Sequence, residues 1–304
     1  MKILVTGGAG FIGSHLVEGL VENGHDVAVL DNFSTGSRKN ISSIPAVKLF
    51  IADIKDEATF KYLSSFFIPD VIYHLAATGS IPTCNENTSL CFENNSAATL
   101  KLLKWAEHHK IKKVIFASSS SVYGESIYSV NEQHDISPIS VYGLSKKVSE
   151  DICLFYNRTS DLKVVITRFF NVYGKKQRDD VSHPAFIPKL IKAAKANDEI
   201  VVYGDGEQSR SFTCVKDVVA GLILMLNDTS NENIYNIASS VSISLNSIIE
   251  EVKKYYPDII VRYTNKYNED EIIYSSADIG LIKNNLGFIP EYNIIEGISW
   301  MLEQ

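Results

Sequence analysis

The sequence has no surplus of basic residues and no long hydrophobic run. Acidic residues outnumber basic ones by 36 to 29, which gives a formal net charge of −7. A chain without a basic stripe cannot neutralise a row of phosphates, so we expect no nucleic-acid partner. No stretch approaches the roughly 18 consecutive apolar residues of a membrane-spanning helix, so we also expect no membrane insertion.

We also expect neither a secretion signal nor a cysteine framework. The opening segment MKILVTGGAG has too short an apolar run for a signal peptide, and no cleavage site follows it. Only four cysteines occur, Cys84, Cys91, Cys153 and Cys214, and none forms a CxxC pair. The spacing favours reduced structural thiols in a cytoplasmic protein over a disulfide or a zinc site, and we expect no metal.

What the sequence does contain is a regular alternation of short apolar runs and longer helical patterns. The short runs are continuously apolar, which is typical of parallel strands buried on both faces. Their alternation with helices predicts an α/β fold built on a Rossmann-like, doubly wound parallel sheet. The expected strands are residues 2–7, 26–31, 47–53, 70–77, 113–119 and 163–172.

The pattern loosens after residue 172, where shorter helical and extended pieces follow one another. This change predicts a second, smaller αβ domain that binds substrate. We expect the Rossmann domain to comprise residues 1–171 plus about 211–237. The smaller domain would comprise about 172–210 plus 238–304.

The segment TGGAGFIG, residues 6–13, predicts a dinucleotide site. Gly7, Gly10 and Gly13 end the first strand and open the first helix, where a pyrophosphate can lie on the helix N-terminus. Asp31 ends the second strand 18 residues after Gly13. A carboxylate there accepts bonds from ribose hydroxyls and repels a 2′-phosphate, which favours NAD over NADP. Asp53 ends the third strand and suits either the adenine amino group or a helix N-cap.

Two further segments predict catalysis: the serine run SSSSVYG at 118–124, and YGLSK at 142–146. Tyr142 and Lys146 are four residues apart and therefore share one helix face. Tyrosine has a pKa near 10, so it is a poor base at neutral pH. The lysine ammonium and a nicotinamide cation would lower that pKa, and a serine of the run would hold the substrate oxygen.

These residues carry a resemblance to a known superfamily. Besides the segments above, the motifs are DNFSTG (31–36), HLAA (74–77), RFFNVYG (168–174), YGDGEQSRSF (203–212) and AD…LG (277–287). Together they resemble the extended short-chain dehydrogenase/reductase enzymes, and within them the nucleotide-sugar C4-epimerases of the UDP-glucose/UDP-N-acetylglucosamine type. The similarity runs from residue 2 to about residue 302.

The resemblance implies a role for each motif. The catalytic residues would be Ser119, Tyr142 and Lys146. The NAD-binding residues would be Gly7, Gly10, Phe11, Ile12, Gly13, Asp31, Asn32, Phe33, Ser34, Thr35, Gly36, Asp53, Ile54, Leu75, Ala76, Ala77, Asn95, Tyr142, Lys146 and Phe169. The UDP-sugar would contact Gly79, Ser80, Ser119, Asn171, Ala185, Tyr203, Arg210, Glu271 and Ser275. A homodimer through the helices at roughly 92–108 and 142–157 is also implied.

The serine run argues against other reactions of the superfamily. Nucleotide-sugar 4,6-dehydratases carry an Asp-Glu pair after the catalytic hydroxyl, and xylose synthases carry a Glu, where this chain has Ser120 and Ser121. A hydroxyl cannot perform the acid/base steps of a carboxyl pair. One expected diphosphate arginine is also missing, because Asn268 occupies its position; Lys266 or Arg262 would replace it.

The sugar itself is predicted from the size of the pocket residues. Gly79, Ser80, Ala185 and Ser275 are small and leave room for an acetamido group at C2, as in the N-acetylhexosamine-preferring branch. We expect activity on UDP-N-acetylglucosamine and UDP-N-acetylgalactosamine, with UDP-glucose and UDP-galactose also accepted. The alternatives are a UDP-glucose 4-epimerase with little N-acetyl activity, a UDP-glucuronate 4-epimerase, and a non-catalytic NAD-binding regulator.

Overall fold

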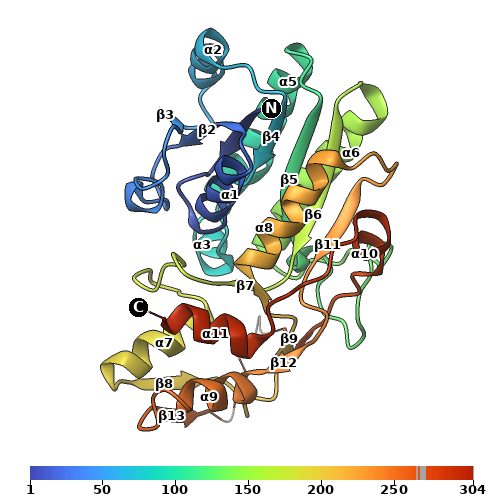
Figure 1. Ribbon diagram of the computed structural model, residues 1–304. Coiled ribbons are helices and arrows are strands. Elements are labelled where there is room, and N and C mark those ends of the chain that lie inside the picture. Colours follow the sequence, from blue (N-terminus) through green and yellow to red (C-terminus); the bar gives the residue numbers. More distant parts are fainter. Residues whose placement is uncertain (265, 268–271, 304) are drawn as a thin grey trace.

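The computed structural model describes residues 1–264, 266–267 and 272–303. Its centre is a seven-stranded sheet with the order β11-β6-β5-β4-β1-β2-β3, in which every neighbouring pair is parallel (Figure 1). The strands are β1 Lys2–Thr6, β2 Asp26–Asp31, β3 Lys48–Ile51, β4 Val71–His74, β5 Lys113–Ser119, β6 Lys163–Phe169 and β11 Ile234–Ile237. The expected doubly wound parallel sheet is confirmed, although four strands, β1, β3, β4 and β6, end earlier than the expected ranges.

Helices cover both faces of this sheet. On one face lie α1 (Phe11–Glu22) and α8 (Val215–Leu224), whose apolar side chains share one core with β1 and β2. On the other face lie α2 (Glu57–Phe66), α5 (Ala98–His108) and α6 (Val141–Thr159), which enclose a second core. Strand order reverses at β1, so the carboxyl ends of β1 and β4 border the crevice where open α/β sheets bind ligands.

A smaller group of elements lies below the carboxyl ends of these strands (Figure 1). It contains a third apolar core. Its helices are α7 Phe186–Ala196, α9 Leu245–Lys253 and α11 Ile294–Leu302, and α10 Gly280–Leu286 packs near β11. Its short strands are β7 Val172–Tyr173, β8 Glu199–Val202, β9 Ser209–Arg210, β10 Thr213–Cys214, β12 Ile243–Ser244, β13 Ile260–Tyr263 and β14 Tyr274–Ser275.

Two local features differ from the sequence prediction. The helix expected over 92–108 is interrupted, because a π-helical turn at Glu93–Ala97 separates α4 (Thr88–Phe92) from α5. The prediction of four reduced thiols is wrong: Cys84, on α3 (Ile81–Glu86), forms a disulfide with Cys91 on α4. The turn between these short helices brings the two Cα atoms to 5.1 Å, which sequence separation alone does not reveal.

Cys153 and Cys214 are free and buried. Within the described ranges, no helix is long and apolar enough to cross a membrane. The same ranges contain no cluster of three or more His, Cys, Asp or Glu side chains that could hold a metal ion.

Candidate active site

The glycine-rich turn after β1 is built for close backbone approach. Gly7 has a φ of +69°, and a Cβ there would lie 2.8 Å from the backbone nitrogen of Ala76, beyond the end of β4. A Cβ on Gly13 would lie 2.2 Å from the Gly7 carbonyl oxygen. Helix α1 begins after Gly10 without a side-chain cap, so its first N–H groups are available to an anion. The turn therefore fits a dinucleotide pyrophosphate.

Asp31 lies at the carboxyl end of β2 and faces this turn. Its carboxylate accepts hydrogen bonds from the backbone N–H of Ala9, at 2.9 Å, and of Phe33, at 2.8 Å. Burial raises the pKa of Asp31, and these two donors oppose the rise. A Cβ on Gly36 would meet both carboxylate oxygens at 3.0 Å, so the loop 31–36 folds tightly around the acid.

The remaining residues expected to contact the adenosine half lie beside Asp31. Asn32 donates to the carboxylate of Asp53 at 2.9 Å and accepts from the Ser34 N–H at 2.9 Å. Ile54 is buried at the edge of the second core. These contacts join the polar residues that follow β2 and β3, although Asn32 and Asp53 are 21 residues apart in the chain.

Ser119, Tyr142 and Lys146 converge at the end of β5. Ser119 donates to the Ser121 hydroxyl at 3.1 Å and is hydrogen-bonded to the Tyr142 hydroxyl. Tyr142 and Lys146 project from the first two turns of α6, which begins after a Ser140 cap. Lys146 is 3% exposed, and its Nζ donates to the Ala117 carbonyl at 2.7 Å. A hydroxyl, a phenol and an ammonium thus occupy one small polar site.

Burial is the main reason why the pKa values of Tyr142 and Lys146 depart from their ordinary values. Burial lowers the pKa of Lys146 to about 8, and the nearby Cys153 and Glu150 oppose that fall. Burial raises the pKa of Tyr142, while the Ser119 hydrogen bond lowers it. The expected lowering of this pKa by Lys146 together with a nicotinamide cation concerns the site with its cofactor, and it stays a prediction. A lower value has to come from a further positive charge at the site, because burial outweighs the serine hydrogen bond.

A buried polar network lies behind the candidate catalytic residues. Arg168 on β6 forms a two-pronged ion pair with Glu150 on α6, at 2.7 and 3.0 Å. Ser118 donates to Glu150 at 2.5 Å, and Arg168 donates to the Tyr123 hydroxyl at 2.8 Å. Tyr123 in turn donates to Asn236 on β11 at 2.7 Å. The network joins α6 to three strands and so fixes the helix that carries Tyr142 and Lys146.

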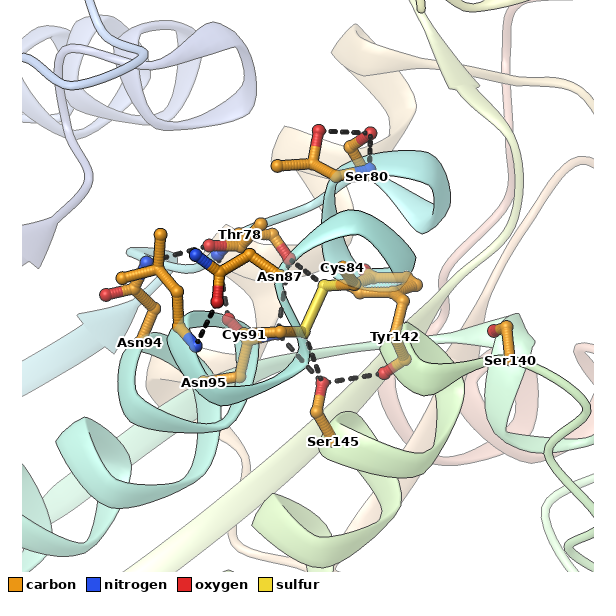
Figure 2. The surroundings of a disulfide bond; sticks show 12 residues. Thr78, Ser80, Cys84, Asn87, Cys91, Asn94, Asn95, Ser140, Tyr142 and Ser145 are labelled. Carbon is orange, nitrogen blue, oxygen red and sulfur yellow. Dashed lines mark hydrogen bonds between the residues drawn. A yellow bond between two sulfur atoms is a disulfide. The ribbon is translucent and has the colours of Figure 1, made fainter.

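Asn95 is placed by the π-helical turn and links the cofactor crevice to α6. It is 1% exposed, accepts from the Thr78 N–H at 2.8 Å, and donates to the Ser145 hydroxyl at 2.9 Å. The Cys84–Cys91 disulfide lies beside Asn95 and Ser145 (Figure 2). Leu75, Ala76 and Ala77 follow β4 directly, next to the glycine turn, and Phe169 is buried at the end of β6.

A cavity of about 340 Å³ lies among the smaller group of elements. Four residues predicted to bind substrate line it: Asn171, Ala185, Tyr203 and Arg210. Phe186, Lys189 and Gln208 also line it and were missed, because neither spacing nor pattern distinguishes them from ordinary helix and loop residues. Arg210 donates to the carbonyl of Ile272 at 2.9 Å, which holds its guanidinium beside the loop before β14.

The predicted sugar residues are divided between this cavity and the serine run. Asn171, with a φ of +39°, donates to the Ser275 hydroxyl at 3.4 Å. Ser275 also lines a smaller hollow with Ser120. Gly79 lies in open space and Ser80 caps α3. The structure therefore brings Asn171 and Ser275 together but places Gly79 and Ser80 on the α3 side.

The structure describes only some of the residues around the position where an expected diphosphate arginine is missing. Glu271 and Asn268 lie outside the described residues. Of the two proposed replacements, Arg262 pairs with Glu199 at 2.8 Å on an exposed strand pair. The carbonyl of Lys266 accepts from the Gly204 N–H at 3.1 Å, which anchors its backbone near the cavity.

Comparisons with known proteins agree with this geometry. The model of the NAD dependent epimerase/dehydratase family matches residues 3–238. The chain is 37% identical over 305 residues to a putative UDP-glucose 4-epimerase of Methanocaldococcus jannaschii, with 98% of both chains covered. It is 34% identical over 322 residues to a UDP-N-acetyl-alpha-D-glucosaminuronate decarboxylase of Bacillus cytotoxicus, with 99% and 98% covered.

Solved structures give the same picture. The UDP-N-acetylglucosamine 4-epimerase of Methanobrevibacter ruminantium M1, in complex with UDP-N-acetylmuramic acid, superposes with a TM-score of 0.90 at 33% identity, covering 98% of this chain and 97% of that one. The UDP-glucuronic acid 4-epimerase of Bacillus cereus, in complex with UDP-glucuronic acid and NAD, also reaches 0.90, at 31% identity, covering 99% and 98%.

The Glu150–Arg168 pair provides a test of the supporting network. Glu150→Ala leaves a buried guanidinium without its partner, and we expect the free energy of unfolding to fall by about 3–5 kcal/mol. The matched control is Asp151→Ala, which removes an exposed carboxylate paired with Lys147 on the same helix and should cost less than about 1 kcal/mol. Urea unfolding of both variants measures this, and equal losses would contradict the structural role of the pair.

Proposed function

The chain belongs to the NAD dependent epimerase/dehydratase family, and we propose that it interconverts UDP-hexoses that differ in configuration at C4. The observation that carries this proposal is the convergence of Ser119, Tyr142 and the buried Lys146 at the end of β5. The glycine turn and Asp31 fit NAD, because the turn admits a pyrophosphate and the acid accepts from ribose hydroxyls. NAD, when bound, supplies the site that accepts hydride from the sugar and returns it.

The chain's own residues handle the proton and the orientation of the sugar. Ser119 holds the O4 hydroxyl through its Oγ, and the Tyr142 oxygen accepts the O4 proton as C4 is oxidised to a ketone. Lys146 binds the nicotinamide ribose. The 4-keto sugar then turns over in the pocket and presents its other face, and Tyr142 returns the proton to O4 as C4 is reduced. No atom is lost from the sugar, so the reaction is an isomerisation.

The residues after Ser119 favour this reaction over elimination or decarboxylation. Ser120 and Ser121 form a single 3₁₀ turn with Val122, and their hydroxyls supply no carboxyl acid/base. A decarboxylase is among the similar proteins, so release of carbon dioxide from a UDP-uronic acid is the reaction to test against epimerisation. A UDP-glucuronate 4-epimerase is the second candidate, supported by the structural similarity to the Bacillus cereus enzyme.

We further propose that N-acetylhexosamines are the preferred sugars. Ser275 and Asn171 are in contact and leave a small hollow toward Ser120, while Ala185 lines the main cavity. Small side chains permit an acetamido group but do not demand one, so UDP-glucose and UDP-galactose would also be accepted. The proposed diphosphate contact is Arg210, and Tyr203 would border the nucleotide.

The division into a Rossmann domain and a substrate domain is proposed with the boundaries given above. A homodimer is proposed through α5 and α6. Leu100, Leu144 and Phe155 on these helices are exposed. Exposed apolar residues on two adjacent helices would be covered if a second copy packed on them.

The first prediction concerns the acid/base. Tyr142→Phe keeps the ring and removes only the hydroxyl, so we expect NAD to remain bound and kcat to fall by about 10²-fold or more, as for loss of a general acid/base. Tyr156→Phe makes the same change on the same helix, far from the serine run, and serves as the control. Both are measured by the interconversion of UDP-sugars, and a Tyr142→Phe enzyme that works like its parent would show that another group moves the proton.

The second prediction concerns cofactor choice. Asp31→Ser removes the charge that repels a 2′-phosphate, so we expect the preference for NAD over NADP to fall by about tenfold or more. Asp53→Asn, which neutralises the neighbouring acid, should leave the preference nearly unchanged. Titration of both cofactors measures the ratio. A parent protein that binds NADP as tightly as NAD would overturn the role given to Asp31.

The third prediction concerns the sugar pocket. Ser275→Tyr fills the space proposed for the acetamido group, and overfilling costs about 1–3 kcal/mol. At 1.36 kcal/mol per decade, kcat/KM for the two N-acetyl sugars should fall by roughly 5- to 150-fold. UDP-glucose and UDP-galactose should lose far less, which makes them the internal control. Equal losses for both pairs would place Ser275 away from C2.

A further inference from the structure

The disulfide between Cys84 and Cys91 ties down a segment whose other side chains are mostly exposed. Among residues 81–90, Cys84 alone is buried, and Cys91 is the next buried side chain. The helices that carry them, α3 and α4, have six and five residues. A helix as short as α3 is not stable by itself, whereas α4 continues through the π-helical turn into α5. The disulfide therefore ties the short α3 to the start of a longer helix that packs on α6.

The sulfur atoms lie against residues of the candidate active site (Figure 2). Cys91 Sγ is 3.5 Å from the Ser145 hydroxyl and 3.5 Å from the Asn95 amide nitrogen. Ser145 precedes Lys146 in the chain and donates to the Tyr142 carbonyl at 2.7 Å. One side of the disulfide thus contacts the helix that carries both proposed catalytic side chains.

The other side of the disulfide contacts the loop after β4. Cys84 Sγ is 3.9 Å from the Thr78 carbonyl oxygen. Asn95 also binds Thr78. Its side-chain oxygen accepts from the Thr78 N–H at 2.8 Å, and its amide nitrogen donates to the Thr78 carbonyl at 3.2 Å. This loop joins the residues proposed to contact NAD, Leu75 to Ala77, to those proposed to face the sugar, Gly79 and Ser80. The segments proposed to hold the cofactor and the sugar therefore join α6 beside this disulfide.

We propose that Cys84 and Cys91 form a redox-sensitive clamp on the wall of the active site. In the oxidised form the clamp holds residues 78–92 against α6. Reduction by a dithiol breaks the sulfur–sulfur bond; two electrons and two protons pass to the cysteines, and the dithiol closes into its own disulfide. The segment, which then lacks its covalent tie, opens more often, and the sugar and the cofactor are held less tightly.

Burial of both sulfurs predicts how the clamp responds to ligands. A reductant reaches them only when the segment opens, so reduction is slower than for an exposed disulfide. Ligands that bind the closed wall oppose this opening, and by linkage the same coupling acts in both directions. NAD and a UDP-sugar should therefore slow the reduction of Cys84–Cys91, whereas a UDP-sugar that does not bind should have no effect.

The experiment compares the oxidised and the dithiothreitol-reduced full-length protein. Alkylation followed by peptide mapping reports the state of each cysteine, and hydrogen exchange reports the opening of residues 78–95. We expect faster exchange in this segment after reduction, a rise of about fivefold or more in the KM for UDP-sugar, at the lower end of typical couplings, and recovery of both on reoxidation.

Two variants separate the clamp from general effects of thiols. Cys84→Ser/Cys91→Ser should behave like the reduced protein with or without dithiothreitol. Cys214→Ala removes a free thiol on β10 and should respond to dithiothreitol like the parent. If the double variant does not fold, the reversible reduction of the parent protein decides the question.

The clamp and the proposed function can fail independently of each other. Only the measurement of KM rests on the proposed function. If no UDP-sugar is turned over, the epimerase proposal fails, while hydrogen exchange and NAD affinity still test the clamp. Free thiols at Cys84 and Cys91 after treatment with an oxidant would overturn it. Unchanged exchange, NAD affinity and KM after complete reduction would also overturn it.

Discussion

The contact between the first turns of α6 and the end of β5 is the constraint on which the site depends. A Cβ at Gly143 would lie 2.4 Å from the Ser121 carbonyl oxygen, so only glycine allows the helix to approach this closely. The Lys146 ammonium closes the contact one turn later by donating to the Ala117 carbonyl. These two contacts with backbone carbonyls fix the position of α6 against β5. Ser119, Tyr142 and Lys146 converge as a result.

The rest of the fold holds this contact in place. The Glu150–Arg168 pair ties α6 to β6, and Tyr123 and Asn236 extend the tie to β11. From the other side, Asn95 and the disulfide join α6 to the loop that follows β4. Helix α6, which carries the proposed catalytic residues, is thus fixed both at its sheet face and at the loop that follows β4. A reaction that needs one proton moved at one oxygen requires positioning of this kind.

Sequence patterns predicted the parts of the site that rest on local rules. The glycine turn, Asp31 at the end of a strand, and the four-residue spacing of Tyr142 and Lys146 each follow from backbone geometry within a few residues. The cores formed as expected because continuous apolar runs have few alternatives to a buried parallel strand. Identity of the sugar is not determined at this level, since small pocket residues permit several substrates.

Features that depend on distant contacts could not be predicted in this way. The Cys84–Cys91 bond depends on a turn between α3 and α4, and Asn95 is placed by a π-helical turn that residue spacing does not predict. Burial raises the pKa of Tyr142 in the chain alone, and the sequence does not reveal this because burial is a tertiary property. Asn171 and Ser275 meet across 104 residues.

The central claim is that C4 is oxidised and reduced again within one site. Proton NMR of the purified protein with UDP-N-acetylglucosamine in deuterated water tests it most directly. The account predicts that UDP-N-acetylgalactosamine appears with protium still at C4, because the hydride that leaves the sugar returns to it. Deuterium at C4 would contradict the hydride mechanism, and the absence of any product from this sugar or from UDP-glucose would contradict the proposed function.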